Sequence, residues 1–314
     1  MNIEEQPLFL RLLSRSPLGS RELLSILLTA PSRYKEHFIE KRHGRGQRRI
    51  SQPTAELKFF QKLLIKHELC DLPVHDSAKA YRQRHSIQNH ALPHALSKYV
   101  LKLDFTDFFP SLSSTAIKRV LTANCNYSDV EKWMICQLLC RRGRGEKALR
   151  LSIGAPSSPF VSNALMFEFD RALAEYCLAG NVVYTRYADD IALSTSERER
   201  LDVVYAYVRH LASSIKYLRL SLNETKTVNV SKKYRRTLTG LTLSNAGTVS
   251  IGREKKRVLR AAVCELSKGG KPEMSVTYIR GMLAFVYSVD RAWVISLIRR
   301  HGFSSIEQIG AKVG

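Results

Sequence analysis

Apolar residues along this chain recur partly at helical spacing and partly in short alternating runs, which together predict a mixture of helices and strands. Helices are predicted in 4–30 (two, separated by Pro17 and Gly19), from Pro53 onward, and at 113–123, 128–141, 157–178, 197–217 and 253–300, the last as two or three helices. Strand patterns occupy 34–51, 99–103, 182–193 and 218–251, whereas 75–97 is polar and irregular. No repeat or long linker interrupts the pattern, so we expect an α+β protein whose parts pack into one body.

Two adjacent acids lie between apolar flanks in residues 184–195, which read YTRYADDIALST. This pattern predicts a strand, a two-residue turn and a second strand, and it would lift the carboxylates of Asp189 and Asp190 to the tip of a hairpin. Hard divalent cations bind carboxylate oxygens that are held in this way. An exposed acidic turn without chemistry is the alternative that these residues alone leave open.

A third acid follows another predicted strand. Residues 98–112 read KYVLKLDFTDFFPSL, and the apolar alternation up to Leu103 brings Asp104 to the strand end. Beside Asp189 and Asp190 on adjacent strands, Asp104 would complete a site for two divalent ions about 3.5–4 Å apart, which suits nucleotidyl transfer. For Asp107, three residues further on, a cap or turn role and a metal contact are both open.

The charge balance of the chain indicates a polyanionic partner. The 314 residues include 50 Lys and Arg against 28 Asp and Glu, a formal net charge of +22. Such an excess favours nucleic acid. A membrane surface is the alternative, but we find no basic amphipathic helix with an aromatic face.

Membrane insertion and secretion are not expected. No apolar run approaches the roughly 18 residues that a spanning helix needs, and the first ten residues, MNIEEQPLFL, lack a secretory signal. We therefore expect a cytoplasmic protein. The six cysteines form no C-x-x-C pair; Cys136 and Cys140 fit one buried helix face better than a zinc site, and all six are expected to be reduced.

The order of these motifs resembles that of bacterial retron reverse transcriptases. The likeness covers about residues 35–300 and rests on LDFTDFFPSL (103–112), IGAPSSP (153–159), YTRYADD (184–190), LNETKT (222–227), TLTGLTLS (237–244) and RGMLAFVYSVD (280–290). It implies a right-hand polymerase without an RNase H domain. N-terminal helices and fingers would occupy 1–97, the palm 98–250 with finger elements interleaved at about 113–160, and a helical thumb 251–314.

The resemblance also implies roles for individual residues. Asp104, Asp189 and Asp190 match the catalytic, metal-binding triad, which would hold two Mg²⁺ ions or Mn²⁺ as a substitute. The substrate-binding matches are Phe109 as the steric gate against a 2′-hydroxyl, Arg48 on the triphosphate, Lys226 as a proton donor to pyrophosphate, and Gly154 and Ala155 in the nucleotide pocket. Core packing for Phe109 and solvated positions for Arg48 and Lys226 are the alternatives.

Three positions depart from the family pattern. Ile153 stands where most members have Gln, and Ser152 replaces the usual Pro before it, so pocket contacts there must differ. His90 replaces the Asn of an Asn-Ala-x-x-His segment that keeps His94. Leu238 replaces the Val of a Val-Thr-Gly triplet. None of these changes removes a metal ligand, so we expect an active polymerase.

Clusters of basic residues are the candidates for RNA contact, because phosphate contacts depend on positive charge. They comprise a fingers turn (Arg42, Arg45, Arg48, Arg49), the 141–144 loop (Arg141, Arg142, Arg144), and a later run (Lys232, Lys233, Arg235, Arg236, Arg253, Lys255, Lys256, Arg257, Arg260). A solvated face is the alternative for any one cluster. Recognition of a particular RNA is expected from the predicted thumb after residue 253.

The resemblance implies an enzyme that copies part of its own structured non-coding RNA into DNA, primed from an RNA 2′-hydroxyl to give branched msDNA. Its partners would be that RNA, the msDNA product, dNTPs, and a separate effector protein in an anti-phage system. A group II intron-like or other bacterial reverse transcriptase is the alternative within enzymes. An RNA-binding scaffold that restrains an effector is the alternative from another class, and the intact acid triad argues against it as the sole role.

Overall fold

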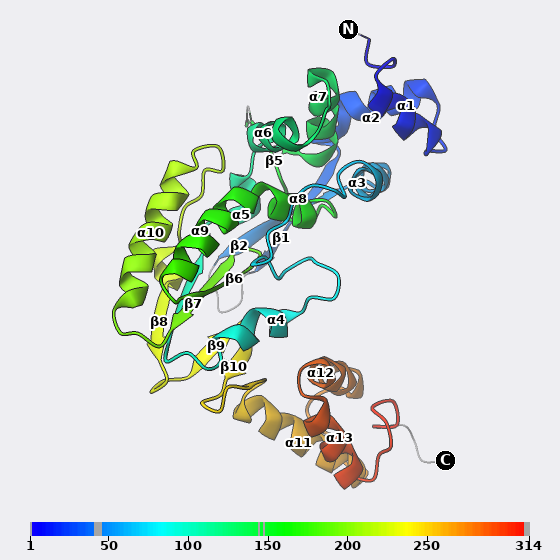
Figure 1. The fold of residues 1–314 in the computed structure, drawn as a ribbon. Helices are drawn as coiled ribbons and strands as arrows, with labels where there is room; N and C mark the ends of the chain where they lie inside the picture. The colour runs from blue at the N-terminus through cyan, green and yellow to red at the C-terminus, as the bar shows by residue number, and fades with distance from the viewer. Residues whose placement is uncertain (1, 41–45, 144, 147, 311–314) are drawn as a thin grey trace.

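The computed structural model describes residues 2–40, 46–143, 145, 146 and 148–310. Its elements follow a curved path, with the N-terminal helices at one end, an antiparallel sheet in the middle and the C-terminal helices at the other end (Figure 1). The predicted mixture of helices and strands is confirmed. Within the described ranges, no helix has both the length and the apolar character that crossing a membrane requires.

The N-terminal part joins short helices to a two-stranded hairpin. Its elements are α1 (Pro7–Ser14), α2 (Ser20–Thr29), η1 (Ala30–Ser32), β1 (Tyr34–Glu40), β2 (Gln47–Pro53) and α3 (Ala55–His67). Pro17 and Gly19 separate α1 from α2 as predicted, but Pro53 ends β2 and does not open the next helix. Proline is tolerated at a strand end, where pairing stops, and here it lies opposite Tyr34 at the start of β1.

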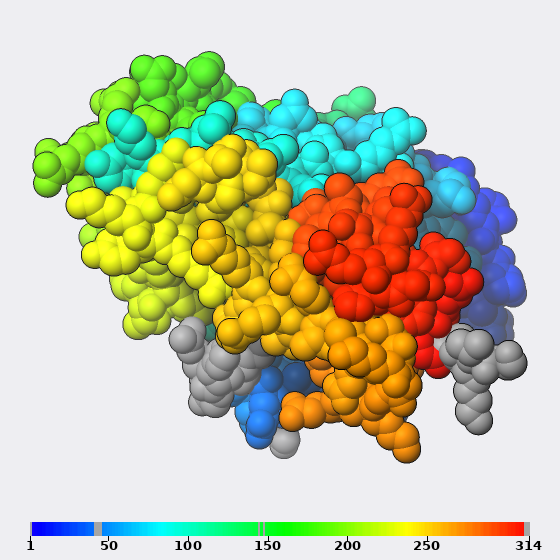
Figure 2. Space-filling view, turned by 90° about the horizontal axis from the view of Figure 1, so that it is seen from below, coloured from blue at the N-terminus to red at the C-terminus, as the bar shows by residue number. Residues whose placement is uncertain are grey.

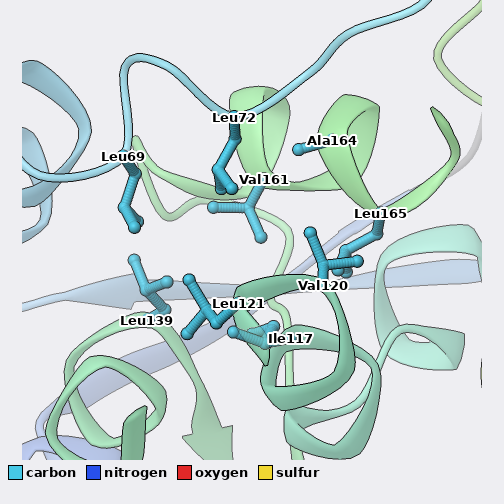
Figure 3. Close-up of a pocket in the computed structure, with 9 residues that line it drawn as sticks. All are labelled: Leu69, Leu72, Ile117, Val120, Leu121, Leu139, Val161, Ala164 and Leu165. Atoms are coloured by element: carbon cyan, nitrogen blue, oxygen red, sulfur yellow. The ribbon is translucent and has the colours of Figure 1, made fainter. Parts of the chain in front are cut away.

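A central group of helices lies between the N-terminal helices and the main sheet and contacts both. It consists of α5 (Phe108–Ser111), α6 (Ser114–Asn124), α7 (Asp129–Leu139), α8 (Ser158–Leu165) and α9 (Phe167–Ala179), with the short strands β4 (Arg141–Arg142) and β5 (Leu149–Arg150). The single helix predicted for 157–178 is two helices that meet at Met166. An apolar void of about 10 Å³ lies among these helices (Figure 3). It is lined by side chains of α6, α7 and α8 and by Leu69 and Leu72 of the loop after α3.

The main sheet has the strand order β6-β7-β3-β8, and all neighbours are antiparallel. The strands are β3 (Tyr99–Asp104), β6 (Val183–Tyr187), β7 (Asp190–Thr195) and β8 (Val228–Ser231), and α10 (Arg200–Ser214) packs with α9 beside them. Side chains alternate along β3: Leu101 and Leu103 join the large hydrophobic cluster, whereas Val100 joins a second one. Strand β3 therefore has an apolar core on each face.

The second cluster belongs mainly to the C-terminal part. It fills the space between a three-stranded sheet of β9 (Arg236–Leu238), β10 (Leu241–Leu243) and β11 (Val249–Ser250), and the helices α11 (Arg253–Ser267), α12 (Val276–Val289) and α13 (Arg291–Arg300). Viewed from below, these helices lie together beside the β8–β11 region (Figure 2). The two or three helices predicted for 253–300 are three in the structure.

The polar stretch 75–97 is more ordered than its composition suggests. It contains α4 (Ile87–Ala91), which begins with a capping box between Ser86 and Asn89, followed by η3 (Leu92–His94). Upstream, Ser77 and Lys79 exchange main-chain hydrogen bonds with Arg186 of β6. All six cysteines are free thiols, and Cys136 and Cys140 are buried as expected.

Candidate active site

The turn between β6 and β7 carries the two adjacent acids. Tyr187 pairs with Asp190, so Ala188 and Asp189 form the two-residue connection. Ala188 has a φ of 58°, a left-handed conformation that costs a residue with a Cβ about 1–2 kcal/mol. The Asp189 carbonyl accepts a 3.2 Å hydrogen bond from the Phe105 amide, which ties the turn to the end of β3.

Asp104 lies on the neighbouring strand at the same level. The register of β3 and β7 puts Asp104 directly opposite Asp190. The Asp104 main-chain carbonyl accepts a 2.8 Å hydrogen bond from the Asn223 amide, and its Oδ2 accepts one of 2.8 Å from Nζ of Lys226. Lys226 belongs to η4 (Glu224–Lys226), so a third segment reaches the same point.

The acids act on one another electrostatically. Burial, followed by the charge of Asp104, raises the pKa of Asp189, and the positive charges of Lys226 and Arg48 oppose that rise. Burial, followed by the charge of Asp189, raises the pKa of Asp190 to about 6. Carboxylates whose ionisation is penalised in this way are relieved by a cation.

The donor set fits a hard divalent ion, because it offers carboxylate oxygens from three positions that repel one another. Across the described part of the chain, no three His, Cys, Asp or Glu side chains are gathered as a ready metal cage. Lys226 occupies Asp104 Oδ2 instead.

A pocket of about 440 Å³ opens between α3, the 152–159 turn and the start of α5. Phe109 and Tyr81 face each other in it with ring centroids 6.5 Å apart. Gly154, with a φ of 115°, also lines it, and a Cβ there would lie 3.0 Å from the Ser51 carbonyl oxygen. This turn needs glycine because it packs directly against β2.

His90 and His94, in the segment before β3, contact Thr185 of β6 and so connect the two parts of the chain. Thr185 Oγ1 lies 2.7 Å from His90 Nδ1 and 2.8 Å from His94 Nε2, and it donates to the His90 carbonyl at 3.1 Å. Burial lowers the pKa of each histidine to about 3, so both are neutral. His90 thus fills the position of the expected Asn with a bond of its own.

Some of the candidate basic residues are exposed, and others already contact partners within the protein. Arg48, Arg142, Lys255 and Arg257 are exposed. Five others already have partners. Arg49 contacts Glu146, Arg141 contacts Glu36 and Glu146, Arg235 contacts Glu254, and Lys256 contacts Asp290. Arg236 donates to the carbonyls of Ala95 and Ser97. Arg141 and Arg236 are buried, so the expectation that they belong to exposed basic clusters is wrong. Arg42, Arg45 and Arg144 lie outside the described residues.

Asp107 is exposed, has a φ of 44° and stands at the N-cap of α5 without a side-chain capping bond. Sequence reasoning missed several residues near the site. Lys58, Lys62 and Tyr81 line the pocket, and Arg186 donates a 2.9 Å hydrogen bond from Nη1 to the Ala188 carbonyl. Arg186 had a visible signal, a charge inside an apolar strand, whereas the pocket lysines look like ordinary surface charges of α3.

Comparison with known proteins shows the family of this chain. Residues 39–243 match the family model described as reverse transcriptase (RNA-dependent DNA polymerase). The chain is similar to the retron Ec83 reverse transcriptase of Escherichia coli, with 34% identity over 88% of this chain and 89% of the relative. It is also similar to the Ec86 enzyme of the same organism, with 31% identity over 88% and 83% of the two chains.

A third relative and one solved structure extend the comparison. The Mx162 retron reverse transcriptase of Myxococcus xanthus is 29% identical over 82% of this chain and 58% of its own length. Among solved structures, apo telomerase from Candida tropicalis aligns with a TM-score of 0.50 at 12% identity, over 89% of this chain and 58% of that chain. At this identity the telomerase match concerns the fold alone.

Proposed function

This chain belongs to the retron reverse transcriptases and is an RNA-directed DNA polymerase; we propose that Asp104, Asp189 and Asp190 carry its chemistry. In such a reaction a primer hydroxyl attacks the α-phosphorus of a dNTP, and pyrophosphate leaves. The observation that carries the proposal is the strand register that puts Asp104 opposite Asp190, next to the turn that holds Asp189.

We propose that the three carboxylates hold two Mg²⁺ ions, for which Mn²⁺ can substitute. Ions bound there would favour the deprotonated primer hydroxyl and neutralise charge on the leaving pyrophosphate. Lys226 would leave Asp104 when the ions bind and donate a proton to pyrophosphate. The raised pKa values of Asp189 and Asp190 support this assignment, because they indicate a site with an excess of negative charge.

The pocket beside the acids is the proposed site of the incoming nucleotide. Phe109 would lie under the sugar and exclude a 2′-hydroxyl, Gly154 and Ala155 would form the wall of the pocket, and Arg48 would contact the triphosphate. The pocket volume supports this proposal, as does the effect of the Arg48 charge on Asp189. Ile153 offers no side-chain hydrogen bond where most family members have Gln, so contact there is apolar.

The remaining parts of the chain would hold the RNA. We propose fingers within 1–97 and about 113–160, a palm within 98–250 and a thumb within 251–314. The exposed cations Arg142, Lys255 and Arg257 are the proposed phosphate contacts, and Arg45 and Arg144 stay proposals outside the described residues. Arg49 and Lys256 would contact RNA only after releasing the acids that they now bind.

We propose that synthesis starts from a 2′-hydroxyl of the cognate structured RNA and gives branched msDNA, within a cytoplasmic anti-phage system that includes a separate effector protein. The test is to incubate the purified protein with the structured RNA encoded beside its gene, dNTPs and Mg²⁺. The expected product is DNA joined covalently to RNA and released by a debranching enzyme. DNA that grows only from free 3′ ends would contradict this mode of priming but not the polymerase assignment.

A further inference from the structure

We propose that Arg186 is a positioning residue for the acid turn: held in place by Asp170, it fixes the peptide that joins Ala188 to Asp189. The inference rests on the proposed role of Asp189 as a metal ligand. It concerns a residue that touches neither substrate nor metal and acts only through the turn.

The Arg186 guanidinium is fully buried, and each of its three nitrogens donates a hydrogen bond. Nε donates to Asp170 Oδ1 at 2.8 Å and Nη2 donates to Oδ2 at 2.6 Å, a bidentate pair between β6 and α9. Nη1 points the other way and donates to the Ala188 carbonyl at 2.9 Å. Because the fork is planar and rigid, the position of Asp170 determines where Nη1 must lie.

The Ala188 carbonyl is a sensitive point of the turn. Ala188 is in the left-handed region at a φ of 58°, where a residue with a Cβ persists only if its surroundings hold it. The plane of the 188–189 peptide sets the direction in which the Asp189 side chain leaves the turn. A donor fixed on that carbonyl therefore orients the carboxylate beyond it.

Fold stability alone does not account for this arrangement. A buried ion pair is costly to desolvate, and apolar residues of similar volume often stabilise a protein equally well. The main-chain bonds of Arg186, from its amide to the Ser77 carbonyl and to its carbonyl from the Lys79 amide, both 2.8 Å long, do not need the side chain. What an apolar side chain cannot supply is the third donor, to Ala188.

The test compares a variant that removes the guanidinium of Arg186 and its contacts to Asp170 and Ala188 with a variant that leaves these contacts intact. In the triple variant Tyr184→Phe, Asp170→Leu, Arg186→Met, apolar groups replace the whole cluster, so no buried charge or hydroxyl is orphaned. Tyr184→Phe alone is the matched control, because it removes the 2.5 Å hydrogen bond that Tyr184 Oη donates to Asp170 Oδ1 and leaves all three bonds of Arg186 in place. Arg186→Lys is the second variant, since one ammonium cannot serve both Asp170 oxygens and the Ala188 carbonyl.

Two measurements are made on each protein: Mn²⁺ binding without substrate, by electron paramagnetic resonance, and turnover of dNTP incorporation against Mg²⁺ concentration. Loss of the fork should weaken Mn²⁺ binding and lower turnover by roughly 10–100-fold, the usual effect of removing a group that orients a ligand. The dNTP KM and the affinity for RNA should stay unchanged, and the control should match the parent.

Each outcome has a defined meaning. If the triple variant is folded and Arg186→Lys is soluble, yet both bind Mn²⁺ as the parent does, the positioning role is wrong. If the triple variant does not fold, Arg186→Lys alone decides by the same criterion. Asp189→Asn is measured alongside: undiminished Mn²⁺ binding by that variant would overturn the metal assignment itself and not only the role of Arg186.

Discussion

Lys226 Nζ and Asp104 Oδ2 are 2.8 Å apart, although 122 positions separate the two residues along the chain. The contact joins the short helix η4 to the end of β3. Asp104 is buried apart from 11% of its side chain, whereas 41% of the Lys226 side chain is exposed. The lysine is the more exposed partner of the pair, and in the proposed metal site it would compete with a cation for the same oxygen.

Replacing Lys226 with Gln should change metal binding and catalysis in opposite directions. Metal binding should tighten because the competing ammonium is gone, whereas turnover should fall by roughly 10²–10⁴-fold because the proposed proton donor is lost. Calorimetric Mn²⁺ titration and single-turnover dNTP incorporation measure the two effects. Lys216→Gln, at an exposed lysine of the segment after α10, is the control. Weaker metal binding by the Lys226 variant would show that the lysine supports the site and does not compete.

Asp190→Asn should abolish DNA synthesis and leave RNA binding largely intact. It should also stabilise the metal-free protein at neutral pH by on the order of 1–3 kcal/mol, since it removes a carboxylate whose pKa is raised to about 6 by burial and by Asp189. Urea unfolding with a chelator, primer extension with Mg²⁺ and filter binding measure the three effects. Asp71→Asn removes an exposed acid as the control. Synthesis near the parent rate would remove Asp190 from the triad.

The same pKa shift predicts how metal binding depends on pH. Below about 6, Asp190 is protonated and a proton must leave before an ion binds, so affinity should fall as pH decreases, by up to about tenfold per unit. The sign for stability is opposite. The folded metal-free protein retains a proton that the unfolded chain loses near the ordinary Asp pKa, so this contribution is present at low pH and is lost as pH rises through about 6. Mn²⁺ titrations from pH 5 to 8 test the first effect, and a flat profile would contradict it.

Phe109→Val should admit ribonucleotides, because it removes the ring that faces Tyr81 across the proposed nucleotide pocket. Discrimination between dNTP and rNTP, taken as the ratio of their kcat/KM values, should fall by about two powers of ten or more, a loss of roughly 3 kcal/mol. Phe109→Tyr keeps the ring and should keep discrimination. If both variants discriminate as the parent does, Phe109 is a packing residue beside Phe108.

Reversal of charge at Lys255 and Arg257 should weaken binding of the cognate RNA more than it slows extension of a generic primer–template at saturating concentration. Both side chains are exposed at the start of α11. Each lost phosphate contact should flatten the plot of log affinity against log salt by roughly 0.7–0.9. Filter binding over a salt series is the measurement. Lys256 is left unchanged because its bond to Asp290 is structural, and an unaltered slope would assign the RNA to other cations.

Local patterns predicted the strands that carry Asp104, Asp189 and Asp190, because alternation and turn residues are properties of neighbouring positions. The same patterns could not distinguish free cations from engaged ones. Arg141 is separated from Glu36 by 105 positions, and only the folded chain brings them together. The fork of Arg186 and the lysines of the pocket escaped prediction for the same reason. The irregular stretch 75–97 was misjudged because its helix α4 is fixed by a capping box and by buried histidines, not by an apolar face.

Because β3 has an apolar core on each face, we expect that the C-terminal helices cannot be removed from this enzyme without loss of its fold. Val100 of β3 and Ala192 of β7 pack into the same cluster as Leu259 and Leu283 of the C-terminal helices, while Leu101 on the opposite face belongs to the other cluster. A fragment that ends before α11 would expose to water the face of the main sheet that carries Val100 and Ala192. We expect it to aggregate or to lose the alignment of Asp104, so the proposed thumb cannot be removed without damage to the proposed active site.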